Sequence, residues 1–425
     1  MEGEMDNAFD VIVIGGGTAG VIAAIQSARA DHKTLLIEKN ALPGGTMTAG
    51  AIGVPGLFHA WKKQIIAGIG WELVSQASAE SGYSLPDFEQ QTGNNDFYTY
   101  QINVNPLIYA LLCEEKMVAA GVNILYHTML ADLTIEKEGL SVTICTREGL
   151  RKFHAKRLID CTGDAYAVAM AGYEVIHPFP CQPASICCNL SGYDYKKLDW
   201  GVIRNAADKA LAAGELKIND LSYNTKWFPS HFLKLHGMNS NHVFPEIPPH
   251  SAEGRSALEQ SAHRTLLRAY RFLRKQPGLE NLKMDMTAFE CGVRESAVIK
   301  GIYTITGEDY TAAKKYPDAL CNAYYPIDIH TESGVGPHEL AEGLVPQVPL
   351  RALIPEKSEF ILAAGRCISS DREANSALRV QATCMATAQA AAAAACVSIR
   401  QNVPVSQASL ENVRGLLKQN GAILP

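Results

Sequence analysis

The sequence predicts an α/β fold in which a parallel, Rossmann-like sheet carries an inserted β-meander. A second, discontinuous domain is expected to be mixed α/β with an antiparallel sheet. Three observations favour this fold: a strand–glycine loop–helix–strand unit over Phe9–Lys39, strand-like segments separated by short turns between 123 and 160, and the loss of strand–helix alternation from about 167 to 345. At 425 residues the chain exceeds one comfortable core, so two domains are expected.

The opening unit has the pattern of a dinucleotide-binding βαβ motif. Gly15 suits the tight turn after the first strand, Gly17 lets a pyrophosphate approach the backbone, and Gly20 lets helix and strand pack closely. The helix N-terminus, which includes Thr18 and Ala19, then faces the phosphates with unpaired N–H groups. Glu38 follows Gly20 by 18 positions, which suits an acid that binds ribose hydroxyls and repels a ribose phosphate.

Composition excludes several classes of protein. The net charge of −6 gives no electrostatic footprint for nucleic acid. The 11 cysteines include no C-x-x-C pair, so no redox disulfide of the glutathione reductase type is expected; they are interpreted as buried thiols in a reducing compartment. The histidines show no metal-ligand spacing, so we expect no metal site.

The two ends of the chain favour a cytoplasmic protein with no membrane partner. The N-terminal residues are acidic and run directly into the first strand, unlike a signal peptide. The small-residue run Ala386–Val397 has about 12 residues, against the roughly 20 that span a bilayer.

The first domain is predicted over 1–166. A glycine-rich loop that contains Gly44, Gly45 and Thr46 follows Glu38, and its many glycines indicate backbone lying close to a ligand. A helical excursion is expected around 60–102, with a helix over 65–79, and a second helix runs from Pro106 to Gly121. The meander strands are expected over 123–136, 140–146 and 151–160, and the last strand leads to Thr162, Gly163 and Asp164.

The second domain is predicted over 167–345, and 346–425 returns to the first. Four strands and two helices are expected in the second domain: 184–190, 242–247, 286–291 and 323–330, with helices over 200–213 and 251–275. The return segment is expected to form a buried strand over 360–365, a polar loop over 366–376 and a helix over 377–397. No second strand–G-x-G-x-x-G unit is present, which argues against a separate nicotinamide domain.

These motifs together resemble the FAD-dependent oxidoreductases of the two-domain glutathione-reductase-like superfold, on the side that includes fumarate reductase and succinate dehydrogenase flavoproteins. The resemblance also rests on Arg294-Glu295-Ser296, Pro326–His330 and Leu350–Pro355. It implies that FAD is the cofactor and that the cofactor-binding residues are Gly15, Gly17, Thr18, Ala19, Gly20, Glu38, Lys39, Gly44, Gly45, Thr46, Thr162, Gly163, Asp164, Gly365, Arg366, Asp371 and Arg379.

Three residues are predicted to serve catalysis. Arg379, expected in the first turn of the helix over 377–397, or Arg366 would stabilise negative charge on a reduced flavin. His330 is the candidate base, because imidazole titrates near neutral pH. Arg294 would bind a substrate carboxylate or polarised oxygen with its planar fork, and Asp328 and Glu295 would orient these groups. A structural role for each of these residues is the competing interpretation.

The predicted function is hydride transfer between a small organic substrate, such as a hydroxy acid or a sugar derivative, and flavin N5. Two alternatives remain open at this stage: an NAD-dependent dehydrogenase, and a flavin-dependent tRNA-modifying or non-redox flavin-binding protein. The electron donor or acceptor and the formation of homo-oligomers are also open.

Overall fold

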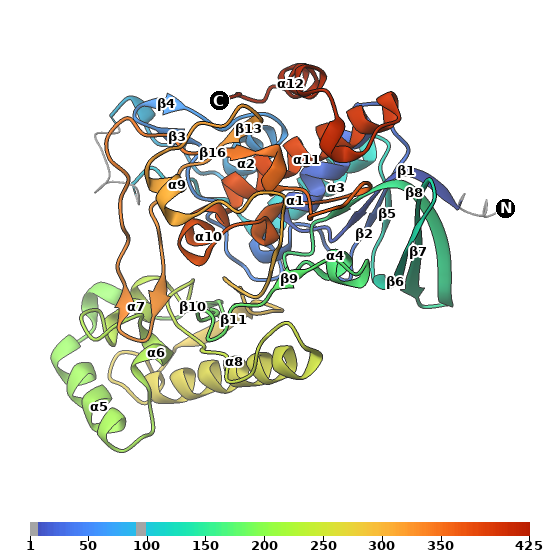
Figure 1. The fold of residues 1–425 in the computed structure, drawn as a ribbon. Helices are drawn as coiled ribbons and strands as arrows, with labels where there is room; N and C mark the ends of the chain where they lie inside the picture. Colours follow the sequence, from blue (N-terminus) through green and yellow to red (C-terminus); the bar gives the residue numbers. More distant parts are fainter. Residues whose placement is uncertain (1–6, 91–98) are drawn as a thin grey trace.

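A computed structural model describes residues 7–90 and 99–425. The predicted excursion around 60–102 therefore lies partly outside the described residues. The chain forms a larger unit around one mixed sheet and a smaller cap that lies below it in Figure 1. The α/β fold with a parallel sheet, a meander and a cap is confirmed.

The main sheet has the order β5-β2-β1-β8-β7-β6, with β17 also paired to β8. Strands β5, β2, β1, β8 and β17 run parallel, whereas β6, β7 and β8 form the antiparallel meander. The strands of this sheet are β1 Ala8–Ile14, β2 Thr34–Ile37, β5 Asn123–Leu125, β6 Met129–Glu136, β7 Gly139–Thr146, β8 Gly149–Asp160 and β17 Ile361–Ala363.

The long strand β8 joins the meander to the parallel sheet. Its N-terminal half pairs with β7 at 149–155, and its C-terminal half pairs with β1 at 154–160 and with β17 at 158–160. The carboxyl ends of β1, β8 and β17 therefore meet at one edge, where ligands bind in sheets of this kind. The pairing of β17 with β8 places the return segment in the sheet of the first domain; the predicted domain bounds themselves stay a prediction.

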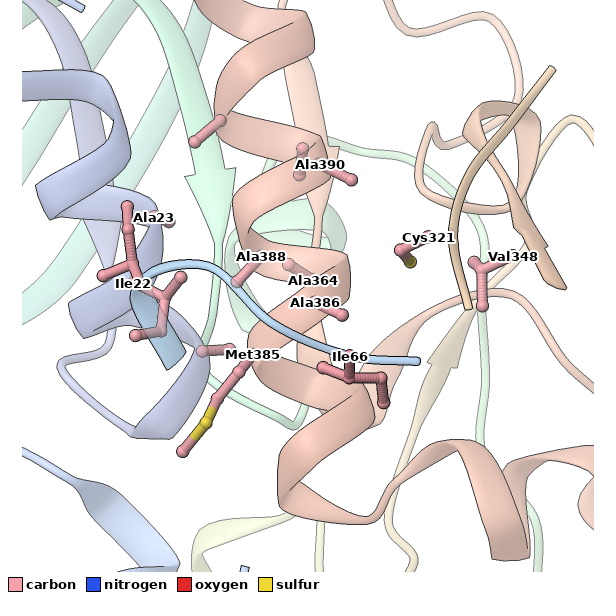
Figure 2. Close-up of a cluster of buried hydrophobic side chains, with 14 of the residues drawn as sticks. Ile22, Ala23, Ile66, Cys321, Val348, Ala364, Met385, Ala386, Ala388 and Ala390 are labelled. Atoms are coloured by element: carbon pink, nitrogen blue, oxygen red, sulfur yellow. The ribbon is translucent and has the colours of Figure 1, made fainter. Parts of the chain in front are cut away.

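Helices cover the sheet and form a large apolar core. Val11 and Val13 face the core shared with α1 and α11, whereas Ile12 and Ile14 face the core on the opposite side of the sheet. Figure 2 shows the alanine-rich α11 packed against Ile22 and Ala23 of α1. The helices of the larger unit are α1 Thr18–Arg29, α2 Ile69–Glu80, α3 Pro106–Ala119, α4 Tyr166–Met170, α9 Gly307–Thr311, α10 Arg372–Leu378, α11 Gln381–Gln401 and α12 Leu410–Gln419.

The cap has its own apolar core, built mainly from residues between 184 and 293. Its helices are α5 Trp200–Ala212, α6 Ile218–Leu221, α7 Ser230–Lys234 and α8 Ala252–Leu273, and its antiparallel pair is β10 Cys188–Ser191 with β11 Lys283–Thr287. The remaining strands are two to four residues long: β3 His59–Ala60, β4 Lys63–Gln64, β9 Val175–Ile176, β12 Val298–Ile299, β13 Ala319–Asn322, β14 His330–Thr331, β15 Gly334–Val335 and β16 Gln347–Pro349. Buried apolar side chains between Ile305 and Ile354 pack in the core of the larger unit, whereas His330 of β14 contacts His242 of the cap.

Several strand predictions were wrong in extent. The segment 123–136 is two strands, because the backbone of His127 has a φ of 51° and turns the chain from β5 into β6. The segment 242–247 forms only an isolated bridge between Val243 and Ala184, since Pro245 cannot donate to a ladder. The segment 323–330 contains Pro326 and forms regular strand only at its end, in β14.

The predicted helix over 377–397 was also wrong at its start. Two helices, α10 and α11, meet there, because the extended backbone of Val380, with a φ of −66° and a ψ of 140°, separates them. Among the described residues α11 alone is long and apolar enough to span a membrane, but 89% of its apolar window is buried inside the protein, as in a core helix.

Candidate active site

The glycine turn after β1 is packed as the motif requires. Gly15 has a φ of +93°, and a Cβ placed there would lie 2.8 Å from the carbonyl oxygen of Cys161. A Cβ at Gly20 would lie 1.8 Å from the carbonyl oxygen of Gly15. Both glycines therefore serve the close packing of α1 against β1 and β8.

Gly17 differs from these two glycines, because the protein leaves space for a Cβ there. Its backbone is extended, with a φ of −67° and a ψ of −175°, and the nearest atom to an added Cβ is the Cα of Gly45 at 3.8 Å. The loop 44–46 is fixed beside it, since Gly44 donates from its N–H to the carbonyl oxygen of Gly16 over 2.7 Å. This open cradle at a helix N-terminus fits a pyrophosphate.

Glu38 stands at the end of β2, where the dinucleotide motif places a ribose-binding acid. Its carboxylate accepts hydrogen bonds from the N–H of Gly16 at 2.6 Å and of Asn40 at 2.7 Å. Burial raises the pKa of Glu38, although these two hydrogen bonds act in the opposite direction. Lys39 forms an ion pair with Glu290 of the cap, so the predicted cofactor contact of Lys39 competes with a contact between the two units.

One cavity extends from the N-terminus of α1 to the interface with the cap. Most predicted site residues line it: Gly17, Thr18, Ala19, Gly45, Thr46, Thr162, Gly163, Arg294, His330, Gly365, Arg366 and Arg379. It also contains residues that were not assigned a direct site role, among them Gln101, Asn239, Tyr325, Asp328 and Gln381. Three residues predicted for catalysis, far apart in the sequence, thus lie around one space.

Arg294 is a buried cation in the wall of this cavity. Its side chain donates to the carbonyl oxygen of Pro183 at 2.8 Å, to Oγ of Ser185 at 3.0 Å and to Oδ1 of Asn239 at 3.1 Å. These bonds use three of the five N–H donors of a guanidinium. In the described part of the chain no carboxylate forms an ion pair with Arg294, so its charge is left for a ligand.

Asp328 and His330 face Arg294 across the cavity and are hydrogen-bonded to each other. Nε2 of His330 lies 3.1 Å from Oδ2 of Asp328, and Nδ1 of His330 lies 2.7 Å from Nε2 of His242. Burial, with the charge of Arg294, lowers the pKa of His330 to about 4. Burial acts to raise the pKa of Asp328, but the hydrogen bond from His330 and the charge of Arg379 outweigh it, so the pKa lies below its ordinary value.

Arg379 is the second cation of the cavity, and its side chain is 12% exposed. It follows α10 and precedes the first turn of α11, which corrects its predicted place inside that turn. One terminal nitrogen donates to the carbonyl oxygen of Asp328 at 3.1 Å, while Nε is buried without a hydrogen-bond partner in the described residues. Burial lowers the pKa of Arg379 to about 10, so the side chain stays charged at neutral pH.

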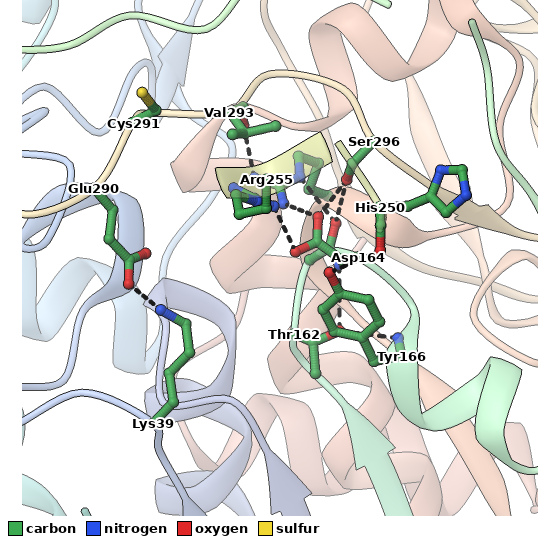
Figure 3. Close-up of polar contacts among 12 residues, drawn as sticks. Lys39, Thr162, Asp164, Tyr166, His250, Arg255, Glu290, Cys291, Val293 and Ser296 are labelled. Atoms are coloured by element: carbon green, nitrogen blue, oxygen red, sulfur yellow. Dashed lines mark hydrogen bonds and ion pairs between the residues drawn. The ribbon is translucent and has the colours of Figure 1, made fainter. Parts of the chain in front are cut away.

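Arg366 lines the cavity, but its guanidinium is bound by groups of the protein. Its guanidinium donates to the carbonyl oxygens of Gly163 at 2.9 Å and Val293 at 2.6 Å, and to Asp164 at 2.7 Å. Arg255 of α8 binds the other oxygen of Asp164 at 3.0 Å, as Figure 3 shows. Because Asp164 neutralises Arg366, Arg379 is better placed than Arg366 to stabilise negative charge in the cavity.

Asp164→Asn should lower the free energy of unfolding by about 3 kcal/mol, because it leaves two partly buried arginines without their buried carboxylate. Burial acts to raise the pKa of Asp164, but Arg366 and Arg255 hold it below its ordinary value. The contribution of the carboxylate is therefore complete above the unfolded-state pKa, and it is lost as pH falls through the lower folded-state pKa. Urea unfolding of the FAD-loaded protein along an acid series measures this loss.

The exposed Asp285→Asn variant serves as the control for this series. It should follow the wild-type protein throughout. If Asp164→Asn loses stability in parallel with the wild-type protein as pH falls through the acid range, Asp164 does not act through its charge.

Asp371 occupies a structural position, which argues against its predicted flavin contact. Its Oδ1 accepts from the N–H of Ala374 at 2.8 Å and caps α10, and its Oδ2 accepts from the N–H of Gly307 at 2.8 Å. Both carboxylate oxygens are thus used within the protein, and Asp371 does not line the cavity described above.

A family model described as FAD-dependent oxidoreductase matches residues 10–417. The chain belongs to this family. The protein is therefore an enzyme whose cofactor is FAD. The glycine cradle, Glu38 and the cavity are the features of this FAD-dependent oxidoreductase that fit the cofactor. The family match favours an FAD enzyme over an NAD-dependent dehydrogenase, which was one of the two alternatives left open by the sequence.

Individual relatives are distant from this FAD-dependent oxidoreductase. The dihydrolipoyl dehydrogenase of Trypanosoma brucei brucei is 44% identical over 55 residues, which is 13% of this chain and 12% of that protein. A geranylgeranyl bacteriochlorophyll reductase-like protein from Thermoplasma acidophilum has 13% identity and a TM-score of 0.44, over 97% of this chain and 83% of that one. Glycine oxidase from Geobacillus kaustophilus has 16% identity and a TM-score of 0.30, over 44% of this chain and 63% of that one.

Proposed function

We propose that this FAD-dependent oxidoreductase acts on a small 2-hydroxy carboxylate. The observation that carries the proposal is Arg294, a side chain only 7% exposed whose charge has no carboxylate partner among the described residues. Arg379 adds a second charge to the same cavity, whereas Asp328 is the carboxylate that faces both. An anion is the ligand that satisfies this excess of positive charge.

The substrate would be held and activated by residues of the cavity wall. Arg294 binds the substrate carboxylate with the N–H donors that the protein leaves unused. FAD, when bound, supplies an acceptor for the hydride or a donor of it at N5. Arg379 stabilises negative charge that develops in the cavity, because its side chain is largely buried and remains protonated.

The hydroxyl proton of the substrate goes to Asp328 in this proposal. Both ring nitrogens of His330 already have partners in the protein, so His330 is poorly placed to act as the base by itself. Oδ1 of Asp328 accepts no hydrogen bond from the described part of the chain, and the residue lines the cavity. The charge of Arg294 lowers the pKa of both Asp328 and His330. A bound substrate carboxylate would offset that charge and make Asp328 more basic.

A sugar derivative is the second candidate that the sequence left open, and the unpaired charge of Arg294 favours an acid over a neutral sugar. The relationship to fumarate reductase and succinate dehydrogenase flavoproteins stays a prediction. The electron donor or acceptor also lies outside this proposal.

Anaerobic bleaching of the flavin distinguishes these substrate classes. We expect 2-hydroxy carboxylates such as lactate, malate or 2-hydroxyglutarate to bleach the visible absorption band of the FAD-loaded protein, and their neutral methyl esters and simple sugars to leave it unchanged. Each amide or ester of an acid serves as the matched control for that acid. Bleaching by neutral sugars but by none of the acids would contradict the proposal.

A further inference from the structure

His242 belongs to the cap and contacts the proposed proton-accepting pair directly. It is 3% exposed, and its Nε2 lies 2.7 Å from Nδ1 of His330. Two further contacts fix the ring: it stacks on Tyr223 with centroids 4.4 Å apart, and its backbone N–H donates to the carbonyl oxygen of Asn219 at 3.0 Å. A ring held in this way cannot turn away from His330 without unpacking the cap.

The carboxylate of Asp328 determines where the protons of both rings lie. Oδ2 of Asp328 can only accept, so Nε2 of His330 must carry a hydrogen. Nδ1 of neutral His330 is then an acceptor, and Nε2 of His242 must carry the hydrogen between the two rings. Nδ1 of His242 is left bare, which agrees with its burial without a partner in the described residues.

We infer that His242 is a positioning residue: its Nε2–H donates to Nδ1 of His330 and fixes that ring, in the tautomer protonated at Nε2, against Asp328. In this tautomer His330 donates to Oδ2 of Asp328, and Oδ1 of Asp328, a residue that lines the cavity, accepts no hydrogen bond from the described residues. The contact crosses between units, because Ile327 just before Asp328 packs in the core of the larger unit, and His242 lies between α7 and α8 of the cap. The cap therefore supplies the hydrogen bond that fixes the His330–Asp328 pair when it lies in the position seen here.

The surroundings of His242 keep it neutral, as this role requires. The titratable and charged groups around it are His330 and Asp328 from the 326–331 segment, Tyr223 before α7, His231 of α7 and Arg294 of the cap. Burial and the charge of Arg294 lower the pKa of His242, and His330 and His231 act in the same direction.

The catalytic role of His242 rests on the proposed function. The hydrogen bond from His242 to His330 can be tested without a substrate. Nitrogen-15 NMR of the FAD-loaded protein labelled at histidine reports the tautomer of each ring at neutral pH. His330, assigned by the loss of its signals in His330→Gln, should carry hydrogen at Nε2 and a bare Nδ1. His242→Gln should preserve this state, because the glutamine amide can donate to Nδ1. His242→Leu should leave Nδ1 bare but without a donor, so its nitrogen-15 signal should shift downfield to the position of a nitrogen that accepts no hydrogen bond.

Turnover on the acid that bleaches the flavin fastest gives the second readout. His242→Leu should lower kcat on the order of 10- to 100-fold, and His242→Gln should restore most of it, because positioning needs a donor but no titration. His263→Gln is the matched control, because His263 is an exposed histidine on α8 of the cap.

The outcomes separate this inference from the proposed function. If no acid bleaches the flavin, the proposed function fails while the NMR result still decides the role of His242. A wild-type His330 with hydrogen at Nδ1, or an unchanged Nδ1 signal of His330 in His242→Leu, would overturn the inference. Equal loss of turnover in His242→Gln and His242→Leu would show that His242 must titrate, which also contradicts a purely positioning role.

Discussion

Gly17→Ala should yield a folded protein that has lost most of its affinity for FAD. The backbone of Gly17 lies at a φ of −67°, and an added Cβ would meet no atom closer than 3.8 Å, so the fold tolerates alanine there. The methyl group would instead occupy the cradle at the N-terminus of α1, where the pyrophosphate is expected. We expect the Kd for FAD, measured by quenching of flavin fluorescence on titration of the apoprotein, to rise about 10- to 100-fold, or roughly 1.4–2.8 kcal/mol.

Two other glycine variants serve as controls for Gly17→Ala, one expected not to fold and one expected to behave as the wild-type protein. Gly15→Ala should fail to fold, because its Cβ would lie 2.8 Å from the carbonyl oxygen of Cys161 at a φ of +93°. Gly415→Ala in α12 places a methyl group in open space and should leave both melting and FAD affinity unchanged. If Gly17→Ala binds FAD as tightly as the wild-type protein, the cofactor does not pass over this turn.

Arg294→Met should abolish most activity on carboxylate substrates while FAD remains bound. The substitution removes a buried cation that the proposed substrate pairs with, and such pairs contribute about 2–5 kcal/mol. We therefore expect kcat/KM for the best 2-hydroxy carboxylate to fall on the order of 10²- to 10³-fold. Arg294→Lys keeps the charge but not the planar fork, so it should recover only part of this loss.

The exposed Arg264→Met variant on α8 is the matched control and should retain wild-type kcat/KM. Thermal melting and flavin content of each variant show whether the cap and the cofactor site survive, because Arg294 also bonds Pro183, Ser185 and Asn239. Arg294→Met with unchanged kcat/KM on acids would remove Arg294 from substrate binding.

The features that are local in sequence could be predicted from it. Gly15, Gly20 and Glu38 follow β1 and β2 at fixed spacing, and the structure places them as the motif requires. The N-terminus of α3 could also be predicted, because Asn105 caps the helix and Pro106 begins it. Short-range stereochemistry determines these features, so distant residues do not change them.

The relation between residues distant in sequence could not be predicted. Arg294, His330 and Arg379 were identified one by one, but their meeting with Asp328 in one cavity depends on how the cap packs. His242 was missed, because its partner is 88 residues away and the histidine sits in an irregular segment with no periodic pattern. A contact of this kind leaves no signal in a single sequence.

Two local features, a helix break and a helix cap, were missed for a different reason. The break between α10 and α11 falls at Leu378–Gln381, where neither glycine nor proline marks the end of a helix. The cofactor contact of Asp371 stays a prediction; an aspartate that precedes a helix often serves as its N-cap, and Asp371 caps α10 here. The position of Asp371 just before a helix was therefore the sequence signal for its capping role.

FAD and an anion are expected to share one cavity, with FAD at the end lined by Gly17 and the anion at Arg294. The most direct test is a titration of the FAD-loaded protein with oxalate, a planar analogue of a 2-hydroxy carboxylate, followed through the visible flavin spectrum. We expect a saturable spectral change for the wild-type protein, none with the neutral analogue oxamide, and a much weaker response in Arg294→Met. Equal responses to oxalate and oxamide, or an unaltered oxalate response in Arg294→Met, would contradict this expectation.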